Sequence, residues 1–77
     1  PRDMPTVLVV DDEPIVREVV CGYLRRDGFA TVEAADGPSA LRAVEAGSLS
    51  LVVLDLMLPG IDGLEVCRRI RRRSDVP

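Results

Sequence analysis

The chain has 77 residues, of which 47% are hydrophobic and 30% charged, and this balance fits one small globular domain rather than a disordered chain. Its two cysteines and the absence of histidine exclude a disulfide scaffold and a Cys/His zinc site. The net charge is −3, and all ten basic residues are arginine. The apolar runs are too short to span a membrane and no signal peptide is recognisable, so we expect a cytoplasmic protein.

The first three predicted elements are a strand, a helix and a second strand. Thr6–Val10 is apolar from its second residue onward, which is typical of a strand buried on both faces. A helix is expected from Pro14 to about Asp27, because proline suits a first helical turn and Gly28 suits a helix end. Ala30–Ala34 alternates apolar and polar residues, which favours an edge strand. The predicted core face of the helix consists of Val16, Val19, Val20, Tyr23 and Leu24.

The next three elements repeat this alternation. Pro38–Ala46 is predicted to be a short helix that ends before Gly47. Leu51–Leu54 is entirely apolar and is expected to be a strand buried on both faces. The last helix is predicted to start after Asp62 as its N-cap and to run to about Arg73. Its expected inner face consists of Leu64, Cys67 and Ile70, flanked by Val66.

Alternating strands and helices predict a parallel sheet with crossover helices. The order 2-1-3 places the first strand centrally, and right-handed crossovers place the first helix on one face and the other two helices on the opposite face. The third strand then has an apolar, unpaired edge, which natural domains avoid. We therefore expect a further strand to begin at Asp75–Pro77, or this edge to pair with another chain and form a dimer or other association.

Acidic residues follow two strands that are neighbours in this order. Asp11, Asp12 and Glu13 follow the first strand, and Asp55 follows the third. Ligands of open α/β sheets bind at such a topological switch point, beside the carboxyl ends of the strands. Asp11, Asp12 and Asp55 offer hard oxygen ligands, which suit Mg²⁺ or Mn²⁺. A carboxylate beside such a metal can also be a nucleophile and form an aspartyl phosphate.

These residues occur in three segments that together resemble a known family. The segments are Val9–Pro14, then Ala35-Asp36-Gly37, then Leu54–Glu65 with its Pro-Gly-Ile-Asp-Gly loop. They closely resemble the receiver domain of two-component response regulators, and the loop is similar to that of winged-helix transcriptional regulators. The resemblance implies a flavodoxin-like, three-layer αβα fold with strand order 2-1-3-4-5. Residues 1–77 would form a single partial receiver domain that ends after the third helix.

The resemblance also implies roles for individual residues. Asp55 matches the phosphoacceptor, which takes its phosphoryl group from a sensor histidine kinase or a histidine phosphotransfer domain. Asp12 matches a direct Mg²⁺ ligand, and Asp11 matches the neighbour that holds the metal largely through water. Met57 matches the position whose backbone carbonyl ligates the metal. The residues that match those shaping the following loop are Pro59, Gly60 and Gly63.

The resemblance implies partners as well. In the family, one edge of the first helix docks the histidine-bearing helices of the kinase, which here corresponds to Ile15, Glu18 and Gly22. A DNA-binding output domain is expected outside this chain. Two family residues have no counterpart here, the Ser/Thr that ends strand 4 and the Lys that ends strand 5. The expected protein is a regulatory phosphoacceptor with at most self-phosphorylation and dephosphorylation activity.

Other interpretations of the residues remain open. The arginines of Arg68–Arg73 could bind nucleic acid, but a solvated helix end explains them as well. A non-phosphorylated interaction module of the same fold is the main alternative function. A haloacid-dehalogenase-like phosphatase needs a second acid where Met57 stands, and a dinucleotide-binding domain needs a Gly-x-Gly-x-x-Gly motif that is missing. Cys21 and Cys67 are expected to be buried thiols on opposite faces of the sheet.

Overall fold

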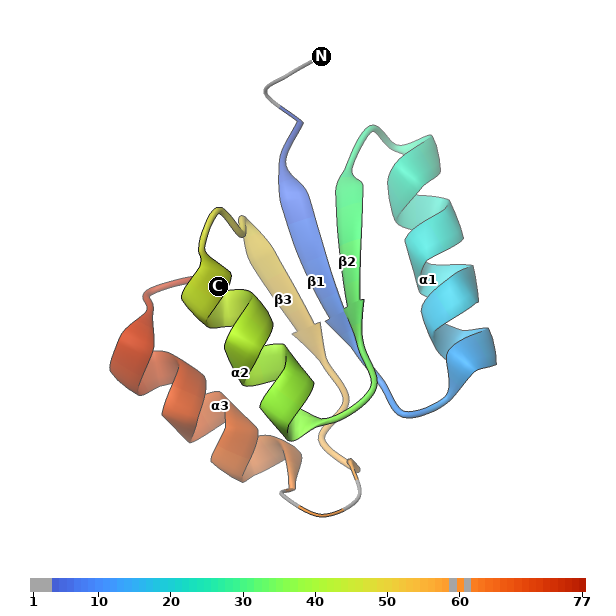
Figure 1. Ribbon diagram of the computed structural model, residues 1–77. Coiled ribbons are helices and arrows are strands. Elements are labelled where there is room, and N and C mark those ends of the chain that lie inside the picture. Colours follow the sequence, from blue (N-terminus) through green and yellow to red (C-terminus); the bar gives the residue numbers. More distant parts are fainter. Residues whose placement is uncertain (1–3, 59, 61) are drawn as a thin grey trace.

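A computed structural model describes residues 4–58, 60 and 62–77 of the chain. Strands and helices alternate along it, as predicted, and the strand bounds agree with those of the apolar runs (Figure 1). The elements are β1 (Thr6–Val10), α1 (Pro14–Arg26), β2 (Ala30–Ala34), α2 (Gly37–Ala46), β3 (Leu51–Leu54) and α3 (Gly63–Arg73).

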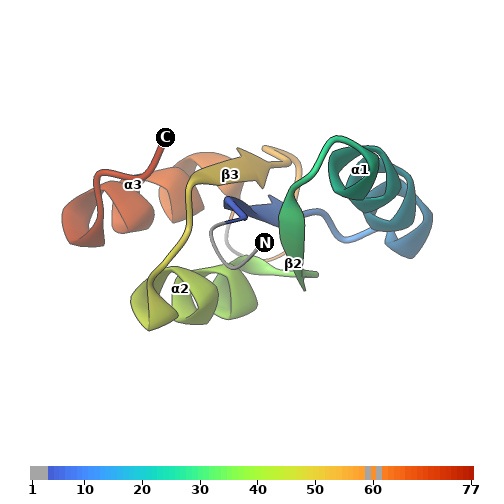
Figure 2. The ribbon, with the colours of Figure 1, turned by 90° about the horizontal axis from the view of Figure 1, so that it is seen from above.

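The three strands form a parallel sheet in the order β2-β1-β3, which confirms the predicted topology. Seen along the strands in Figure 2, α1 lies on one side of the sheet, and α2 and α3 lie on the other. The central strand is covered on both faces, so that Val7–Val10 are at most 1% exposed. This three-layer arrangement agrees with right-handed crossovers between parallel strands.

Two groups of buried side chains hold the layers together. On one face, Leu8 and Val10 pack with residues of α2 and α3, and this is the larger group. On the other face, Val7 and Val9 pack with Cys21 of α1.

Cys21 and Cys67 are both free thiols. The prediction that Cys21 is buried is confirmed, because it is fully inaccessible.

The predicted core faces of two helices are partly wrong. In α1, Val19 and Tyr23 are 51% and 65% exposed, because the line that meets the sheet runs through Val20, Cys21 and Leu24 instead. In α3, the buried residues include Val66 and Ile70, whereas Leu64 and Cys67 are exposed. The physical reason is that α3 packs mainly against α2, so its buried line is the one through Val66 and Ile70 that faces the core shared with α2, rather than the one through Leu64 and Cys67.

The prediction that β3 is buried on both faces is also wrong. Leu51 and Val53 are 38% and 39% exposed. They pair with Val7 and Val9, so they face the side of the sheet that carries α1. That helix lies over β1 and β2 and leaves this part of β3 uncovered (Figure 2). The other side of β3 contributes partly buried residues to the larger core.

The C-terminal residues lie beside the outer edge of β3. The backbone N–H of Val52 donates a hydrogen bond of 2.8 Å to the carbonyl oxygen of Pro77. Val76 is buried in the larger core. The chain therefore returns to β3 at the residues where the sequence predicts a further strand to begin.

Side-chain caps fix the starts of α2 and α3. Asp36 accepts a hydrogen bond of 2.8 Å from the Ser39 N–H, and this bond holds the pKa of Asp36 below its ordinary value. Asp62 accepts a bond of 2.9 Å from the Glu65 N–H, which confirms the predicted N-cap.

Across the described residues, we find no helix with the length and apolar character that crossing a membrane requires.

Candidate functional site

The acidic residues at the ends of β1 and β3 are placed by the backbone pairing of the sheet. The N–H of Asp55 donates to the carbonyl oxygen of Val10 at 3.0 Å, and the N–H of Asp11 donates to that of Ala34 at 3.1 Å. Both acids thus continue the strand pairing by one residue. As a result, one carboxylate oxygen from each of Asp11, Asp12 and Asp55 lies within 4.8 Å of the others. We call these three residues the acidic triad.

Local hydrogen bonds orient two carboxylates of the acidic triad. Oδ1 of Asp11 accepts from the Glu13 N–H at 2.9 Å, and Oδ1 of Asp55 accepts from the Met57 N–H at the same distance. Each bond uses one oxygen and leaves the second oxygen of that carboxylate open to a ligand or a reaction. Asp11 and Asp55 are half-buried, whereas Asp12 is exposed.

The loop after β3 contains the remaining residues predicted for the site. Met57 is two residues beyond Asp55, and it is 85% exposed, so the core does not need its side chain. Metal ligation by its carbonyl oxygen stays a prediction. Gly60 has a φ of 77°, a left-handed conformation that favours glycine. The predicted role of Pro59 lies outside the described residues.

Gly63, the first residue of α3, lies directly against the backbone of this loop. Its N–H donates to the carbonyl oxygen of Leu56 at 3.2 Å. A Cβ at this position would lie 2.7 Å from the carbonyl oxygen of Asp55 and closer still to the Cα of Leu56. Only glycine permits this approach, so Gly63 sets the distance between α3 and the backbone of Asp55 and Leu56.

Arg17 is a residue of this site that the sequence reasoning missed. Its side chain lies between the loop after β1 and the edge strand β2, and it is 17% exposed. Nη1 donates to the carbonyl oxygen of Asp11 at 2.8 Å, and Nε donates to Glu33 at 3.1 Å. The signal in the sequence was an arginine in the first turns of the helix that follows the acidic residues.

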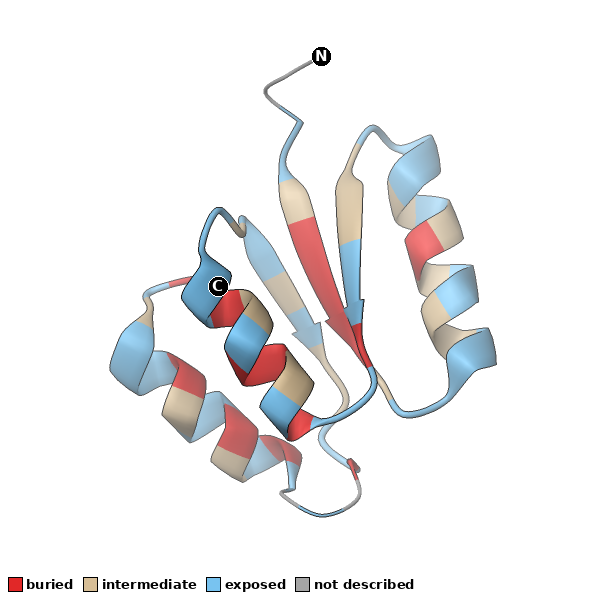
Figure 3. Ribbon diagram, viewed as in Figure 1, coloured by how far each residue is buried: buried red, intermediate tan, exposed pale blue. Residues whose placement is uncertain are grey.

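The predicted kinase-docking residues lie on α1. Ile15 is 74% exposed, Glu18 is exposed and Gly22 is half-buried. The exposed side chains of Val19 and Tyr23 extend this surface, and together with Ile15 they recur every fourth residue. Figure 3 shows exposed positions along the length of α1. We call Ile15, Glu18, Val19, Gly22 and Tyr23 the α1 patch.

Three of the five arginines of α3 are engaged with nearby acids. Arg68 and Arg69 pair with Glu65 at 3.3 and 3.0 Å, and Arg73 pairs with Glu45 of α2 at 3.4 Å. The hydrogen bond from Arg69 is the main reason that the pKa of Glu65 is lowered. These pairs favour a solvated helix face over a nucleic-acid surface.

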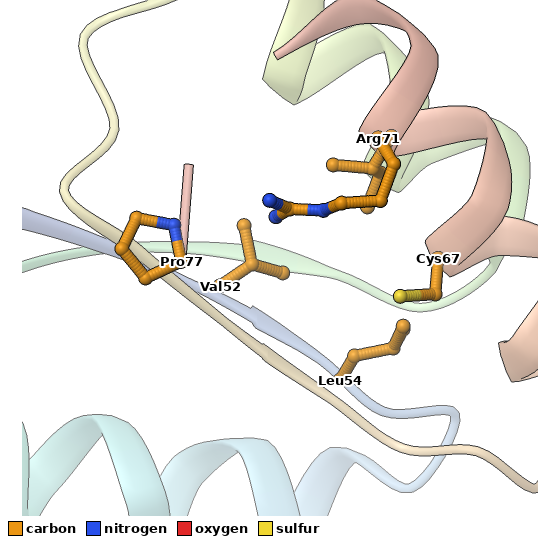
Figure 4. Close-up of a pocket in the computed structure, with 6 residues that line it drawn as sticks. Val52, Leu54, Cys67, Arg71 and Pro77 are labelled. Atoms are coloured by element: carbon orange, nitrogen blue, oxygen red, sulfur yellow. The ribbon is translucent and has the colours of Figure 1, made fainter. Parts of the chain in front are cut away.

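A small pocket lies apart from the acidic triad, between β3 and α3 (Figure 4). It has a volume of about 90 Å³ and is largely apolar. Its lining residues are Val52, Leu54, Cys67, Ile70, Arg71 and Pro77. Cys67 is exposed because it faces this opening rather than the core, which corrects the prediction that it is buried.

The fold and the site together define a class of protein, the flavodoxin-like α/β domains with an acidic pocket at the switch point of a parallel sheet. Within this class, the chain belongs to the response regulator receiver domain family, whose sequence profile matches residues 7–77. The resemblance found in the motifs is thereby confirmed.

Individual relatives agree with this assignment. The DNA-binding response regulator MtrA of Mycolicibacterium smegmatis is 49% identical over 71 residues, which are 92% of this chain and 31% of that protein. The response regulator TrrA of Thermotoga maritima, solved with Mg²⁺-BeF, is 42% identical with a TM-score of 0.88, over 92% of this chain and 62% of that one. TrrA in complex with the histidine kinase ThkA matches with a TM-score of 0.89 at 42% identity, over 95% and 64%. The chain spans about a third of the length of the curated relatives it matches.

Proposed function

We propose that Asp55 accepts a phosphoryl group from a phosphorylated histidine of a sensor histidine kinase or a histidine phosphotransfer domain. The acidic triad carries this proposal, because three carboxylates from two adjacent strands converge within 4.8 Å. Residues 1–77 act as a single partial receiver domain, and phosphorylation controls a DNA-binding output domain outside them. The relatives support this reading, since MtrA is a DNA-binding response regulator and TrrA forms a complex with a histidine kinase.

The donor set fits Mg²⁺ or Mn²⁺. Asp11, Asp12, Asp55 and the carbonyl oxygen of Met57 would hold the ion through oxygen atoms alone, as hard cations prefer. The partial exposure of the triad leaves room for the water ligands that Mg²⁺ usually keeps. When bound, the ion offsets the mutual repulsion of the carboxylates and the charge of the incoming phosphoryl group.

The chain itself supplies the nucleophile and its orientation. The Met57 N–H holds Oδ1 of Asp55, so the second carboxylate oxygen is the one free to attack. This oxygen forms a bond to phosphorus as the phosphorus–nitrogen bond of the phosphohistidine breaks, and the imidazole nitrogen keeps the electron pair. The product is an aspartyl phosphate.

The exposed free thiol of Cys67 suits a reducing, cytoplasmic setting for this reaction.

The α1 patch is proposed to dock the kinase. Replacing Glu18 with arginine is expected to slow phosphotransfer from the cognate kinase by about tenfold, the equivalent of roughly 1.4 kcal/mol of docking energy. Phosphorylation by a small phosphodonor should stay unchanged, because Glu18 is not part of the acidic triad. Rates of phosphoryl transfer from the purified kinase measure the effect. The control Glu45→Arg makes the same charge change on α2 and removes only the exposed pair with Arg73, so its transfer rate should equal that of wild type. Equal rates for Glu18→Arg and wild type would remove the α1 patch from the proposal.

The uncovered part of β3 is proposed to associate with a second chain. The exposed side chains of Leu51 and Val53 favour such association through the face of the strand, while the outer edge is engaged at Val52 by the carbonyl oxygen of Pro77. We expect the average mass in sedimentation experiments to rise with concentration, and Val53→Lys to suppress this rise. Val32→Lys is the matched control, since Val32 is also 39% exposed but lies on the opposite edge strand. A monodisperse monomer at all concentrations, with a cooperative melt, would rule out this association.

A further inference from the structure

Arg17 connects three parts of the molecule that meet beside the acidic triad. It belongs to α1, it donates to the main chain of Asp11 in the loop after β1, and it pairs with Glu33 on β2. The interaction with Glu33 holds the guanidinium in place. The side chain is 17% exposed, compared with 58% for Arg25, which contacts the same glutamate at 3.9 Å.

The hydrogen bond from Arg17 is the third of three that hold Asp11 in place. The Asp11 N–H is bound to Ala34 on β2, its Oδ1 is bound to the N–H of Glu13, and its carbonyl oxygen accepts from Arg17. The backbone therefore cannot rotate at this residue without breaking a hydrogen bond. Both Asp11 and the adjacent Asp12 depend on this backbone for the direction of their carboxylates.

We propose that Arg17 is a positioning residue for the divalent cation site, acting through the backbone of Asp11 and Asp12. The proposal rests on the metal site described above. Hydrogen bonds that orient metal ligands commonly contribute a factor of about 10 to 100 in metal affinity. At Asp11, Arg17 binds the main-chain oxygen rather than the carboxylate, so it orients Asp11 and Asp12 without occupying an oxygen that the metal needs.

The sign of the effect separates positioning from simple electrostatics. A guanidinium near the acidic triad repels a divalent cation, so removal of its charge alone would strengthen metal binding. Removal of a positioning contact would weaken metal binding instead. The two explanations therefore predict opposite changes in the dissociation constant for Mg²⁺.

The test compares two substitutions that remove the same charge from the same helix. Arg17→Gln loses the contact with Asp11, and Arg25→Gln loses only contacts with Glu33 and Thr31. Titration calorimetry with Mg²⁺ on the whole chain should give about tenfold weaker binding for Arg17→Gln. For Arg25→Gln, the affinity should equal that of wild type or exceed it. Equal or tighter binding by Arg17→Gln would overturn the proposal.

Two further measurements keep the test independent of overall stability. Thermal melts establish that each variant is folded at the temperature of the titration. If Arg17→Gln is unfolded there, Arg17→Lys takes its place. The shorter fork-less side chain of Arg17→Lys can reach only one of the two partners, Asp11 or Glu33, at a time, so the Mg²⁺ affinity of this variant should fall between those of wild type and Arg17→Gln. In the absence of metal, amide NMR shifts should change most at Asp11–Glu13. Shifts spread evenly over α1 would indicate a merely structural role and contradict the proposal.

Measurements of Mg²⁺ binding distinguish the loss of the metal site from the loss of the role of Arg17. Wild-type protein that does not bind Mg²⁺ at all would contradict the metal site itself. Wild-type protein that binds Mg²⁺ as tightly as Arg17→Gln does would leave the metal site standing and remove only the role of Arg17.

Discussion

Substitution of Asp55 by asparagine is expected to abolish phosphoryl incorporation completely. The amide oxygen can still accept the hydrogen bond from Met57, so the loop keeps its shape, but the side chain has no anionic oxygen left to attack phosphorus. The assay treats the longest natural chain that contains these residues with a small phosphodonor and Mg²⁺. Intact mass spectrometry should then show one added phosphoryl group in wild type and none in Asp55→Asn.

Asp62→Asn is the matched control for this experiment. It makes the same chemical change at an acid near the same loop, and asparagine can still cap α3 there. We expect it to be phosphorylated like wild type. If the wild-type chain gains no mass in the presence of Mg²⁺, Asp55 is not a phosphoacceptor, and the non-phosphorylated interaction module becomes the better interpretation.

Gly63→Ala is expected to cost about 3 kcal/mol of the free energy of unfolding. The new methyl group would meet the backbone of Asp55 and Leu56, which cannot move aside as a flexible side chain could. A domain of this size has about 5 to 10 kcal/mol in total, so the loss is a large share. Chemical denaturation followed by circular dichroism measures it. The displaced α3 should also weaken Mg²⁺ binding at Asp55.

Gly22→Ala provides the comparison for that substitution. Among the residues that the structure describes, no atom outside α1 lies within 4 Å of a Cβ at Gly22, and alanine is the better helix former. The variant should therefore be more stable than wild type, by about 0.5 to 1 kcal/mol. If Gly63→Ala were as stable as Gly22→Ala, the close contact between α3 and the Asp55 backbone would not exist in solution.

The topology and the acidic triad could be predicted from the sequence because both depend on short-range signals. Each apolar run marks a strand, and the acids that follow Val10 and Leu54 are carried to the same edge by the parallel pairing of those strands. Asp62 could be recognised as an N-cap because a cap is defined by a few consecutive residues.

The exposed surfaces could not be predicted in the same way, because they depend on which element covers which. Val19 and Tyr23 have helical spacing with Val20, yet α1 meets the sheet along a neighbouring line. Val53 looks like a core residue in an apolar run, but α1 does not extend over β3. Arg17 reaches Glu33 only because the chain folds back on itself, and a contact across sixteen residues leaves no local pattern.

Titration of the chain with Mg²⁺, followed through the carboxyl ¹³C resonances of its aspartates, examines the acidic triad as a single site. The resonances of Asp11, Asp12 and Asp55 should move together and saturate with one dissociation constant, because their oxygens lie within 4.8 Å of one another. Those of Asp36 and Asp62 should stay in place, since both carboxylates cap helices and neither belongs to the triad. Separate affinities for the three triad residues, or shifts no larger than those of the two caps, would contradict a common divalent cation site.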